Sequence, residues 1–541
     1  MKNKFIYLAI IAAGFASCEP EFDKEVGANY SSGEADFTSY VAIGNSLTAG
    51  YMDGTVSRVG QTYSYPNLLA QQFALVGGGA FTQPSFAEDV NNLGGIQGLT
   101  GTRLVINASV GGVQPIAGSP TITLTPQAMA YNNMGVPGAK SFHLLAPGYG
   151  SAANLLLGRA NPYFVRHATS SSATVIGDAM TKNPTFFTNW IGANDVLAYA
   201  TSGGTMPDNP LTTTVDESVM SANDHNSTGN INPLTYGPND ITNTNLYEST
   251  YRNMINTLTN GGAKGVVCTI PSVTSIPYFT TVKWNPLPAE STTSAVPLYN
   301  FLSLVTAGRI SPLSTTPGSK NPVLIVDEDL SNISSQLVAP FTTFITGYLM
   351  SQPNPPTLAQ AQAQAALMAP VAAQLYGKAR QATANDLVVL TAGGILAPPN
   401  NINPNVPAPF NVNGVTLPLA NKWVLTATEK AKVASATNAY NASIRSIAAT
   451  KNLAVADMNS IMTQLVSGLK IETGQIYTAN YFSGSATEGL VLFSLDGVHP
   501  NARGYAVIAN EIIKVINRHY HSNLPLHNPS YFPGINIVGS N

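Results

Sequence analysis

Cysteine is nearly absent from this chain of 541 residues. Apart from Cys18, near the start, the only cysteine is Cys268, which has no partner for a disulfide within the fold. A disulfide-stapled domain is therefore excluded, and stability must come from an apolar core, which a hydrophobic content of 44% can supply. Cys268 lies in the apolar run "GVVC", where we expect a small buried side chain rather than a reactive thiol.

Charge is also scarce, at 10% of residues, with a formal net charge of −3. The sequence has no basic face and no acidic tail, so we expect no nucleic-acid partner. With so few charged side chains, the surface must be built largely from Asn, Thr, Ser and Gln. Such a surface suits an exported protein.

Long hydrophobic runs are missing except at the start, where Lys2 and Lys4 precede the apolar residues 5–13. This layout predicts a secretory signal, and no other segment offers the roughly 18 uninterrupted apolar residues of a membrane span. The stretch "GFASC" resembles the bacterial lipobox, with Phe15 where Leu is commoner. The resemblance implies cleavage after residues 1–17 and lipidation of Cys18. We then expect residues 18–38 to tether the protein to the cell envelope, at the outer membrane; the alternative is an ordinary secretory signal with an incidental cysteine.

Strand-like and helix-like patterns alternate along the rest of the chain. The strand-like runs are 40–44, 184–191, 264–270 and 453–457, and helical periodicity appears in 64–73, 429–449 and 501–516. This alternation predicts an α/β protein with a parallel sheet wrapped by helices. We expect the main domain to span 39–520 and a tail to occupy 521–541.

Three stretches interrupt the alternation: 77–126, 201–245 and 284–422. The first is rich in glycine, and the second reads as a long polar surface loop. The third is poor in charge and contains an Ala/Gln-rich helical pattern at 361–376, "AQAQAALMAPVAAQLY". We expect it to form a helical cap over an apolar cleft; an accessory bundle on the far side or a surface for docking a partner are the alternatives.

Two short motifs carry side chains suited to nucleophilic catalysis. "VAIGNSLTAG" presents Ser46 directly after an apolar strand, and "SLDGVHP" places Asp496 three residues before His499. A tight Asp-x-x-His turn can orient one ring nitrogen while the other accepts a proton from a serine. Turn and helix-cap roles are the alternative for both motifs, since Asn, Ser and Asp are common caps. The tail histidines His519, His521 and His527 have no acids among them, so we expect them to face solvent and predict no metal site.

Donors for an oxyanion are offered by two further stretches. "NWIGAND" exposes Asn194 after a strand, and "NNMGVPGAKS" places Gly135 and Gly138 in a turn. The Asn194 amide with the backbone N–H groups of Gly138 and Ser46 would make a three-donor oxyanion hole, although Gly135 is a near neighbour of Gly138.

Together, the blocks "GNSLTAG", "GVPGA", "GAND" and "DGVHP" resemble, in order, the four blocks of the SGNH or GDSL hydrolases. The resemblance implies a flavodoxin-like three-layer α/β/α fold and a serine esterase that needs no cofactor or metal. It implies Ser46 as nucleophile, His499 as base oriented by Asp496, and Gly138 and Asn194 as oxyanion donors. One departure is Asn45, where the family's name-giving motif has Asp.

The substrate implied by this resemblance is an ester of a lipid, a small acyl group or an acetylated glycan. Two alternatives stay open: an acyltransferase that uses a sugar hydroxyl in place of water, and a surface glycan- or lipid-binding lipoprotein without catalysis. The sequence does not fix the oligomeric state.

Overall fold

The structure is a computed structural model that describes residues 29–107, 112–208, 220–398, 400–482, 489–535 and 537–538. The expected signal segment 1–17 and Cys18 lie outside these residues. No helix within the described ranges is long and apolar enough to cross a membrane.

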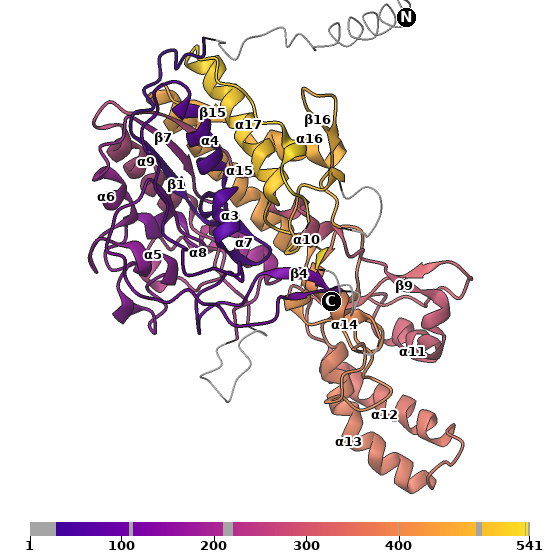
Figure 1. Cartoon of the computed structure of the whole chain (residues 1–541). Helices are drawn as coiled ribbons and strands as arrows, with labels where there is room; N and C mark the ends of the chain where they lie inside the picture. The colour runs from indigo at the N-terminus through magenta and orange to yellow at the C-terminus, as the bar shows by residue number, and fades with distance from the viewer. Residues whose placement is uncertain are drawn as a thin grey trace, which may run out of the picture.

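A five-stranded sheet forms the centre of the molecule, and all of its strand pairs are parallel (Figure 1). In chain order its strands are β1 (Tyr40–Gly44), β6 (Asn133–Gly135), β7 (Phe186–Trp190), β8 (Lys264–Cys268) and β15 (Ala454–Ala456). The sheet order β15-β8-β7-β1-β6 corresponds to the flavodoxin-like order 2-1-3-4-5. In such a sheet the strand order reverses between the first and third strands, here β1 and β7, and ligands bind outside their carboxyl ends.

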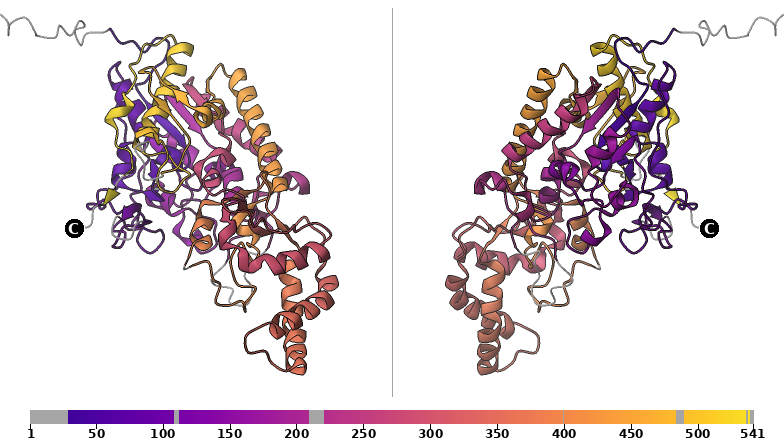
Figure 2. Two further views of the ribbon diagram at one scale, coloured as in Figure 1. Left: turned by 90° about the vertical axis from the view of Figure 1, so that its right-hand side faces the viewer. Right: turned by 90° about the vertical axis from the view of Figure 1, so that its left-hand side faces the viewer.

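Side chains of successive residues in each strand pack into two different apolar layers. Val41 and Ile43 of β1 belong to the core beneath α6 (Val175–Met180), α9 (Thr244–Thr259) and α15 (Ala427–Thr450). Tyr40 and Ala42 belong to the core beneath α4 (Tyr65–Ala74) and α17 (Ala502–His519). Helices therefore cover both faces, as the views in Figures 1 and 2 show, and the three-layer α/β/α prediction is confirmed.

The predicted strands correspond to β1, β7, β8 and β15, with bounds that differ by at most two residues at an end. The sequence analysis missed β6, because its three residues contain one apolar side chain, Met134, and show no strand period. It also missed α9 and α7 (Asn194–Thr201), although α9 buries Tyr247, Tyr251 and Met254 at helical spacing.

Two of the three interruptions contribute to the body of the molecule. Residues 77–126 carry the paired strands β4 (Leu104–Asn107) and β5 (Gly112–Pro115), and Phe86, Ile96 and Ile122 form a small core there. Residues 201–245 are not wholly a surface loop, because His225 and Asp240 are buried. The distance from His225 Nε2 to Asp240 Oδ2 is 2.8 Å.

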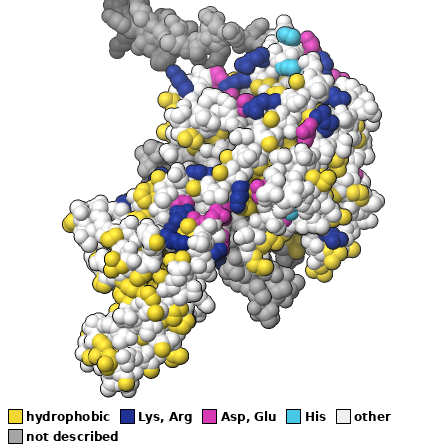
Figure 3. Space-filling view, turned by 180° about the vertical axis from the view of Figure 1, so that it is seen from behind, with side chains coloured by type: hydrophobic (Ala, Val, Ile, Leu, Met, Phe, Trp, Pro, Cys, Tyr) yellow, Lys and Arg dark blue, Asp and Glu magenta, His cyan; other side chains and the backbone are white. Residues whose placement is uncertain are grey.

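Residues 284–422 form a lobe that projects from the body (Figures 1 and 2). Its helices α11 (Val296–Val305), α12 (Ser334–Met350) and α13 (Leu358–Tyr376) share an apolar core of their own, in which Tyr299, Phe341 and Tyr376 are buried. No Asp, Glu, Lys or Arg occurs in 330–377, and Figure 3 shows hydrophobic side chains gathered over this lobe.

Other elements of the described chain are short. They are α2 (Ser46–Ala49), β2 (Tyr51–Met52), β3 (Thr55–Val56), α3 (Arg58–Thr62), α5 (Pro162–His167), α8 (His225–Thr228), α10 (Pro277–Thr280), β9 (Leu287–Pro288), β10 (Lys320–Asn321), β11 (Leu324–Val326), β12 (Ala379–Gln381), β13 (Leu387–Val388), α14 (Gly393–Leu396), β14 (Val424–Leu425), α16 (Met458–Ser467), β16 (Leu469–Lys470), β17 (Ile476–Tyr477) and β18 (Ile537–Val538).

Candidate active site

Ser46 lies at the carboxyl end of β1, in the bend between the strand and the four-residue helix α2. Asn45 caps this helix by accepting a hydrogen bond from the Leu47 amide at 3.2 Å. The bend requires glycine at position 44, since a Cβ there would come within 2.1 Å of Thr48 Oγ1. The strand and the cap thus fix the Ser46 side chain at the topological switch point of the sheet.

His499 and Asp496 lie in the turn that precedes α17, and Asn501 caps that helix. His499 Nε2 is 2.9 Å from Ser46 Oγ, and His499 Nδ1 is 2.9 Å from Asp496 Oδ2. The structure therefore joins these three side chains in one hydrogen-bonded chain. Tyr51 packs against the His499 ring with 4.4 Å between ring centroids, which helps to hold the ring in place.

The Asp496 carboxylate accepts hydrogen bonds on both oxygens. Oδ1 accepts from the amides of Val498 and His499, each at 2.8 Å, and Oδ2 accepts from the Gly54 amide at 3.0 Å as well as from the His499 ring. Burial alone would raise the pKa of Asp496, but the positive charge of His499 and these hydrogen bonds outweigh it, so the pKa lies below its ordinary value. The Asp496 carboxylate therefore keeps its negative charge and can stabilise an imidazolium at His499.

The candidate oxyanion donors Gly138 and Asn194 line the same pocket as His499. Gly138 has a φ of +78°, a conformation that favours glycine, and its amide donates no hydrogen bond within the described chain. The Gly135 amide instead donates a hydrogen bond to Asn133 Oδ1 at 3.0 Å. The geometry therefore favours Gly138 over Gly135 as the oxyanion donor. Asn194 Nδ2 donates one hydrogen bond to Ala139 O at 3.0 Å, which fixes the amide and leaves its second N–H for a ligand.

A buried polar network supports the loop that carries Gly138. Asp195, fully buried, accepts hydrogen bonds from the Ser141 amide at 2.9 Å and from Ser141 Oγ at 2.8 Å. Lys140 Nζ donates to the backbone carbonyl of Asp240 at 2.5 Å. Burial raises the pKa of Asp195, and burial lowers the pKa of Lys140 although Asp195 and Asp240 lie nearby. The network ties the "GAND" and "GVPGA" segments together behind the candidate oxyanion hole.

The pocket that holds these groups has a volume of about 840 Å³ and a mixed polar and apolar lining. Leu104 and Val113 reach it from the β4–β5 pair, and Leu390, Thr391 and Gly394 reach it from the lobe. No residue of α12 or α13 lines it among the described residues, so the helix predicted to cover the cleft lies elsewhere. The lobe contributes to the pocket through residues 390–394 at its base.

Sequence reasoning missed several residues of this site, namely Tyr51, Gly54 and Asp53. They lie in and around the tight β2–β3 hairpin, whose Asp-Gly turn is a recognised hairpin signature that could have found it. Asp53 adopts a φ of +56° and accepts a hydrogen bond from the Leu495 amide at 3.0 Å. Burial raises the pKa of Asp53 to about 6, and the nearby Asp496 charge adds to the effect, while the Leu495 amide opposes it.

The other histidines do not join the site. His527 was expected to face solvent but is half-buried, with Nε2 at 3.0 Å from Leu68 O. Burial lowers the pKa of His143 and of His167 to about 3 in each case. Cys268 is fully buried in β8, and burial raises the pKa of its thiol. Within the described ranges, no group of three or more His, Cys, Asp or Glu side chains could hold a metal ion.

The serine, histidine and aspartate that are hydrogen-bonded at the switch point of this parallel sheet form the arrangement that serine hydrolases use. Comparison with protein families narrows this class, because the family described as GDSL-like Lipase/Acylhydrolase matches residues 344–512. The matched segment contains Asp496 and His499, while Ser46, Gly138 and Asn194 precede it. The chain is similar to this family over that segment, and the similarity identifies it as a carboxylic ester hydrolase. Searches of curated proteins and of solved structures found no match.

Proposed function

We propose that the chain hydrolyses carboxylic esters through a covalent acyl-enzyme intermediate on Ser46. The observation that carries this proposal is the continuous pair of 2.9 Å contacts from Asp496 through His499 to Ser46 Oγ. Ser46 Oγ attacks the ester carbonyl carbon while His499 Nε2 takes its proton. Asp496 holds the Nδ1–H tautomer and stabilises the imidazolium that forms.

The tetrahedral oxyanion requires donors that are already in position, because such donors need no reorganisation when charge develops. The free amide of Gly138, the second N–H of Asn194 and the amide of Ser46 supply them in this proposal. The imidazolium of His499 then gives its proton to the alcohol oxygen as the carbonyl–oxygen bond breaks. Water then attacks the acyl-enzyme while the same imidazole takes its proton. The imidazolium returns that proton to Ser46 Oγ as the bond to the acyl group breaks and the acid product leaves.

We place the enzyme at the bacterial cell envelope, where it is lipid-anchored through Cys18 to the outer membrane. Residues 1–28 lie outside the described chain, so this part of the proposal rests on the sequence alone. Its support is the signal-like start and the lipobox-like "GFASC". The ester substrate is a lipid or an acylated sugar. The proposal includes no cofactor.

The experiment that tests the proposed chemistry is labelling of the folded protein with a fluorophosphonate, followed by hydrolysis of p-nitrophenyl acetate. Wild type should be labelled once, on Ser46, and should release p-nitrophenol, while Ser46→Ala should do neither. Labelling with acetyl transfer to an added sugar, in place of hydrolysis, would support the acyltransferase. A folded wild-type protein that is not labelled would support a non-catalytic binding protein.

A further inference from the structure

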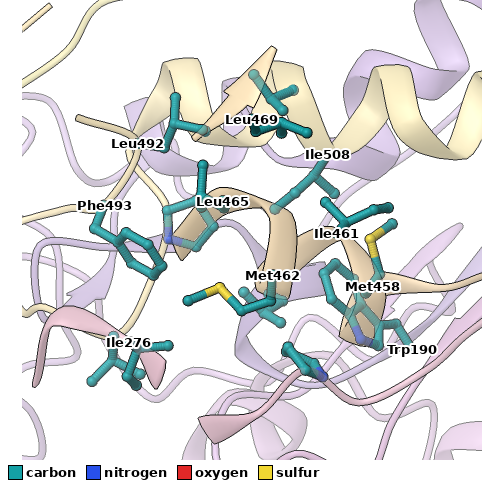
Figure 4. Close-up of a pocket in the computed structure, with 16 residues that line it drawn as sticks. Trp190, Ile276, Met458, Ile461, Met462, Leu465, Leu469, Leu492, Phe493 and Ile508 are labelled. Carbon is teal, nitrogen blue, oxygen red and sulfur yellow. The ribbon is translucent and has the colours of Figure 1, made fainter. Parts of the chain in front are cut away.

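An apolar cavity of about 110 Å³ lies next to the catalytic residues, and the reaction proposed above does not use it. Figure 4 shows it between α16 and α17, with Phe493 and Ile276 on one side and Trp190 on the other. Helix α16 contributes Met458, Ile461, Met462 and Leu465 to its wall. None of its sixteen lining residues is charged, and the indole Nε1 of Trp190 has no hydrogen-bond partner in the described chain.

The cavity begins at the residues that flank the nucleophile and the base. Leu47, which follows Ser46, and Val498, which precedes His499, both line it. Val498 also lines the 840 Å³ catalytic pocket, so the cavity and that pocket share this side chain as a boundary. Neither Ser46 nor His499 lines the cavity, so a group attached to Ser46 Oγ would reach it past Val498.

The chemistry decides which part of an ester extends in each direction. The leaving alcohol must take a proton from His499 Nε2, and His499 lines the larger pocket together with polar groups such as Lys140 and Thr391. The alcohol portion therefore belongs in the larger pocket. The acyl portion, on the other side of the carbonyl carbon, is left to face the cavity.

We propose that this cavity binds the acyl chain, and that the enzyme acts on esters of linear, medium-length fatty acids rather than on acetylated glycans. The inference rests on the proposed function. A cavity of about 150 Å³ lined by aliphatic side chains stays dry and binds benzene, so a comparable apolar cavity accepts hydrocarbon. The flexible thioethers of Met458 and Met462 adapt to a chain that varies in shape. An acetyl group would leave this volume unfilled.

The test is kcat/KM for p-nitrophenyl esters from acetate to dodecanoate. Transfer of one methylene into the cavity should raise kcat/KM roughly fourfold, and the rise should end after about four to six carbons, when the cavity is full. Ile461→Trp should fill the cavity and lower the ratio of hexanoate to acetate kcat/KM at least about tenfold. Met462→Ala should enlarge it and move the optimum to longer chains.

Ile231→Trp is the matched control, because Ile231 is 60% exposed and lines neither the cavity nor the catalytic pocket. It should keep the wild-type ratio. Thermal unfolding and fluorophosphonate labelling show whether each variant is folded with a reactive serine. If Ile461→Trp does not fold, the wild-type series and Met462→Ala decide.

A flat chain-length profile in wild type that hydrolyses acetate would overturn the inference and leave the proposed function standing. Unchanged ratios in the folded cavity variants would do the same. Absence of hydrolysis for every ester would overturn the proposed function, and the inference with it.

Discussion

Gly54 donates its backbone N–H to Oδ2 of Asp496 at 3.0 Å, although 442 residues separate the two in the chain. The same oxygen accepts the hydrogen bond from His499 Nδ1. A hairpin near one end of the chain thus braces a carboxylate near the other end. This contact fixes the carboxylate relative to the histidine ring. It also requires that Oδ2 accept two hydrogen bonds, and a substitution of Asp496 can test this requirement.

Asp496→Asn should lower kcat by about 10⁴-fold while the protein stays folded. The asparagine oxygen can still accept from the amides of Val498 and His499, but the NH₂ group then replaces Oδ2 and meets two donors, the Gly54 amide and the Nδ1–H of His499. The ring therefore turns to the wrong tautomer and cannot take the Ser46 proton. Steady-state hydrolysis of p-nitrophenyl acetate measures the loss, with Asp36→Asn at the exposed Asp36 as control. Activity within tenfold of wild type would show that Asp496 does not orient the base.

Asn194→Ala should lower kcat by roughly 10² to 10³-fold, with a much smaller change in KM, because an oxyanion donor acts mainly in the transition state. The side chain also donates to Ala139 O, so a structural role is the competing interpretation. Thermal unfolding separates the two. Asn253→Ala, at an exposed position of α9, is the control. A destabilised variant with unchanged specific activity would favour the structural role.

The strands with continuous apolar runs could be predicted from the sequence, because burial on both faces leaves a signal in every residue. The run 40–44 corresponds to β1 residue for residue. The short strand β6 could not be predicted, since its place depends on pairing with β1 through Ala42, Ile43 and Gly44 rather than on its own composition. Order in the sheet is likewise a property of pairing, and no single segment encodes it.

For the candidate site, the side chains with chemical function could be read from the sequence, and their environment could not. Ser46 and His499 stand in short motifs that turn chemistry makes recognisable. The Gly54 brace and the cavity wall from α16 depend on contacts between distant segments. The predicted position of the cap was wrong. Apolar helices with little charge are typical of a cover over an apolar cleft, but α12 and α13 bury their apolar faces against each other and against α11 in the lobe.

Asp53→Asn should change how stability depends on pH. Burial raises the pKa of Asp53 from 3.8 to about 6, so the folded protein holds this proton more tightly than the unfolded chain does. Between about pH 4 and pH 6 the folded state binds more protons, so its stability falls as pH rises and stays lower above pH 6. The asparagine keeps an acceptor for the Leu495 amide and removes this fall. Relative to wild type, the variant should gain up to about 3 kcal/mol as pH rises from 4 to 7.

Urea unfolding at each pH from 4 to 8 measures this difference. The exposed Asp36→Asn variant serves again as control, because the carboxyl of Asp36 has no buried environment to lose. Parallel stability curves for wild type and Asp53→Asn would show that folding does not raise the pKa of Asp53.

Cys18→Ser should convert a detergent-requiring, membrane-associated protein into a soluble or uncleaved one, because serine lacks the thiol that carries the diacylglyceryl group. Metabolic labelling with an alkyne fatty acid, followed by membrane fractionation, provides the measurement. Cys268→Ser is the matched control, although its fully buried position requires that folding be checked. Equal incorporation of the fatty acid into wild type and Cys18→Ser would refute the anchor.

Leu390→Trp should slow hydrolysis of esters with bulky alcohols far more than esters with small ones. Leu390 is one of the lobe residues that line the catalytic pocket, where the alcohol portion lies, whereas Leu367 is 78% exposed on α13 and lines no part of it. A tryptophan at position 390 narrows the pocket, so kcat/KM for 2-naphthyl hexanoate should fall at least about tenfold relative to ethyl hexanoate, a loss of about 1.4 kcal/mol in transition-state binding. Leu367→Trp should leave that ratio unchanged, because the acyl chain is the same in both substrates and the α12–α13 hairpin does not meet the alcohol. If Leu367→Trp changed the ratio and Leu390→Trp did not, the hairpin rather than the base of the lobe would contact the substrate.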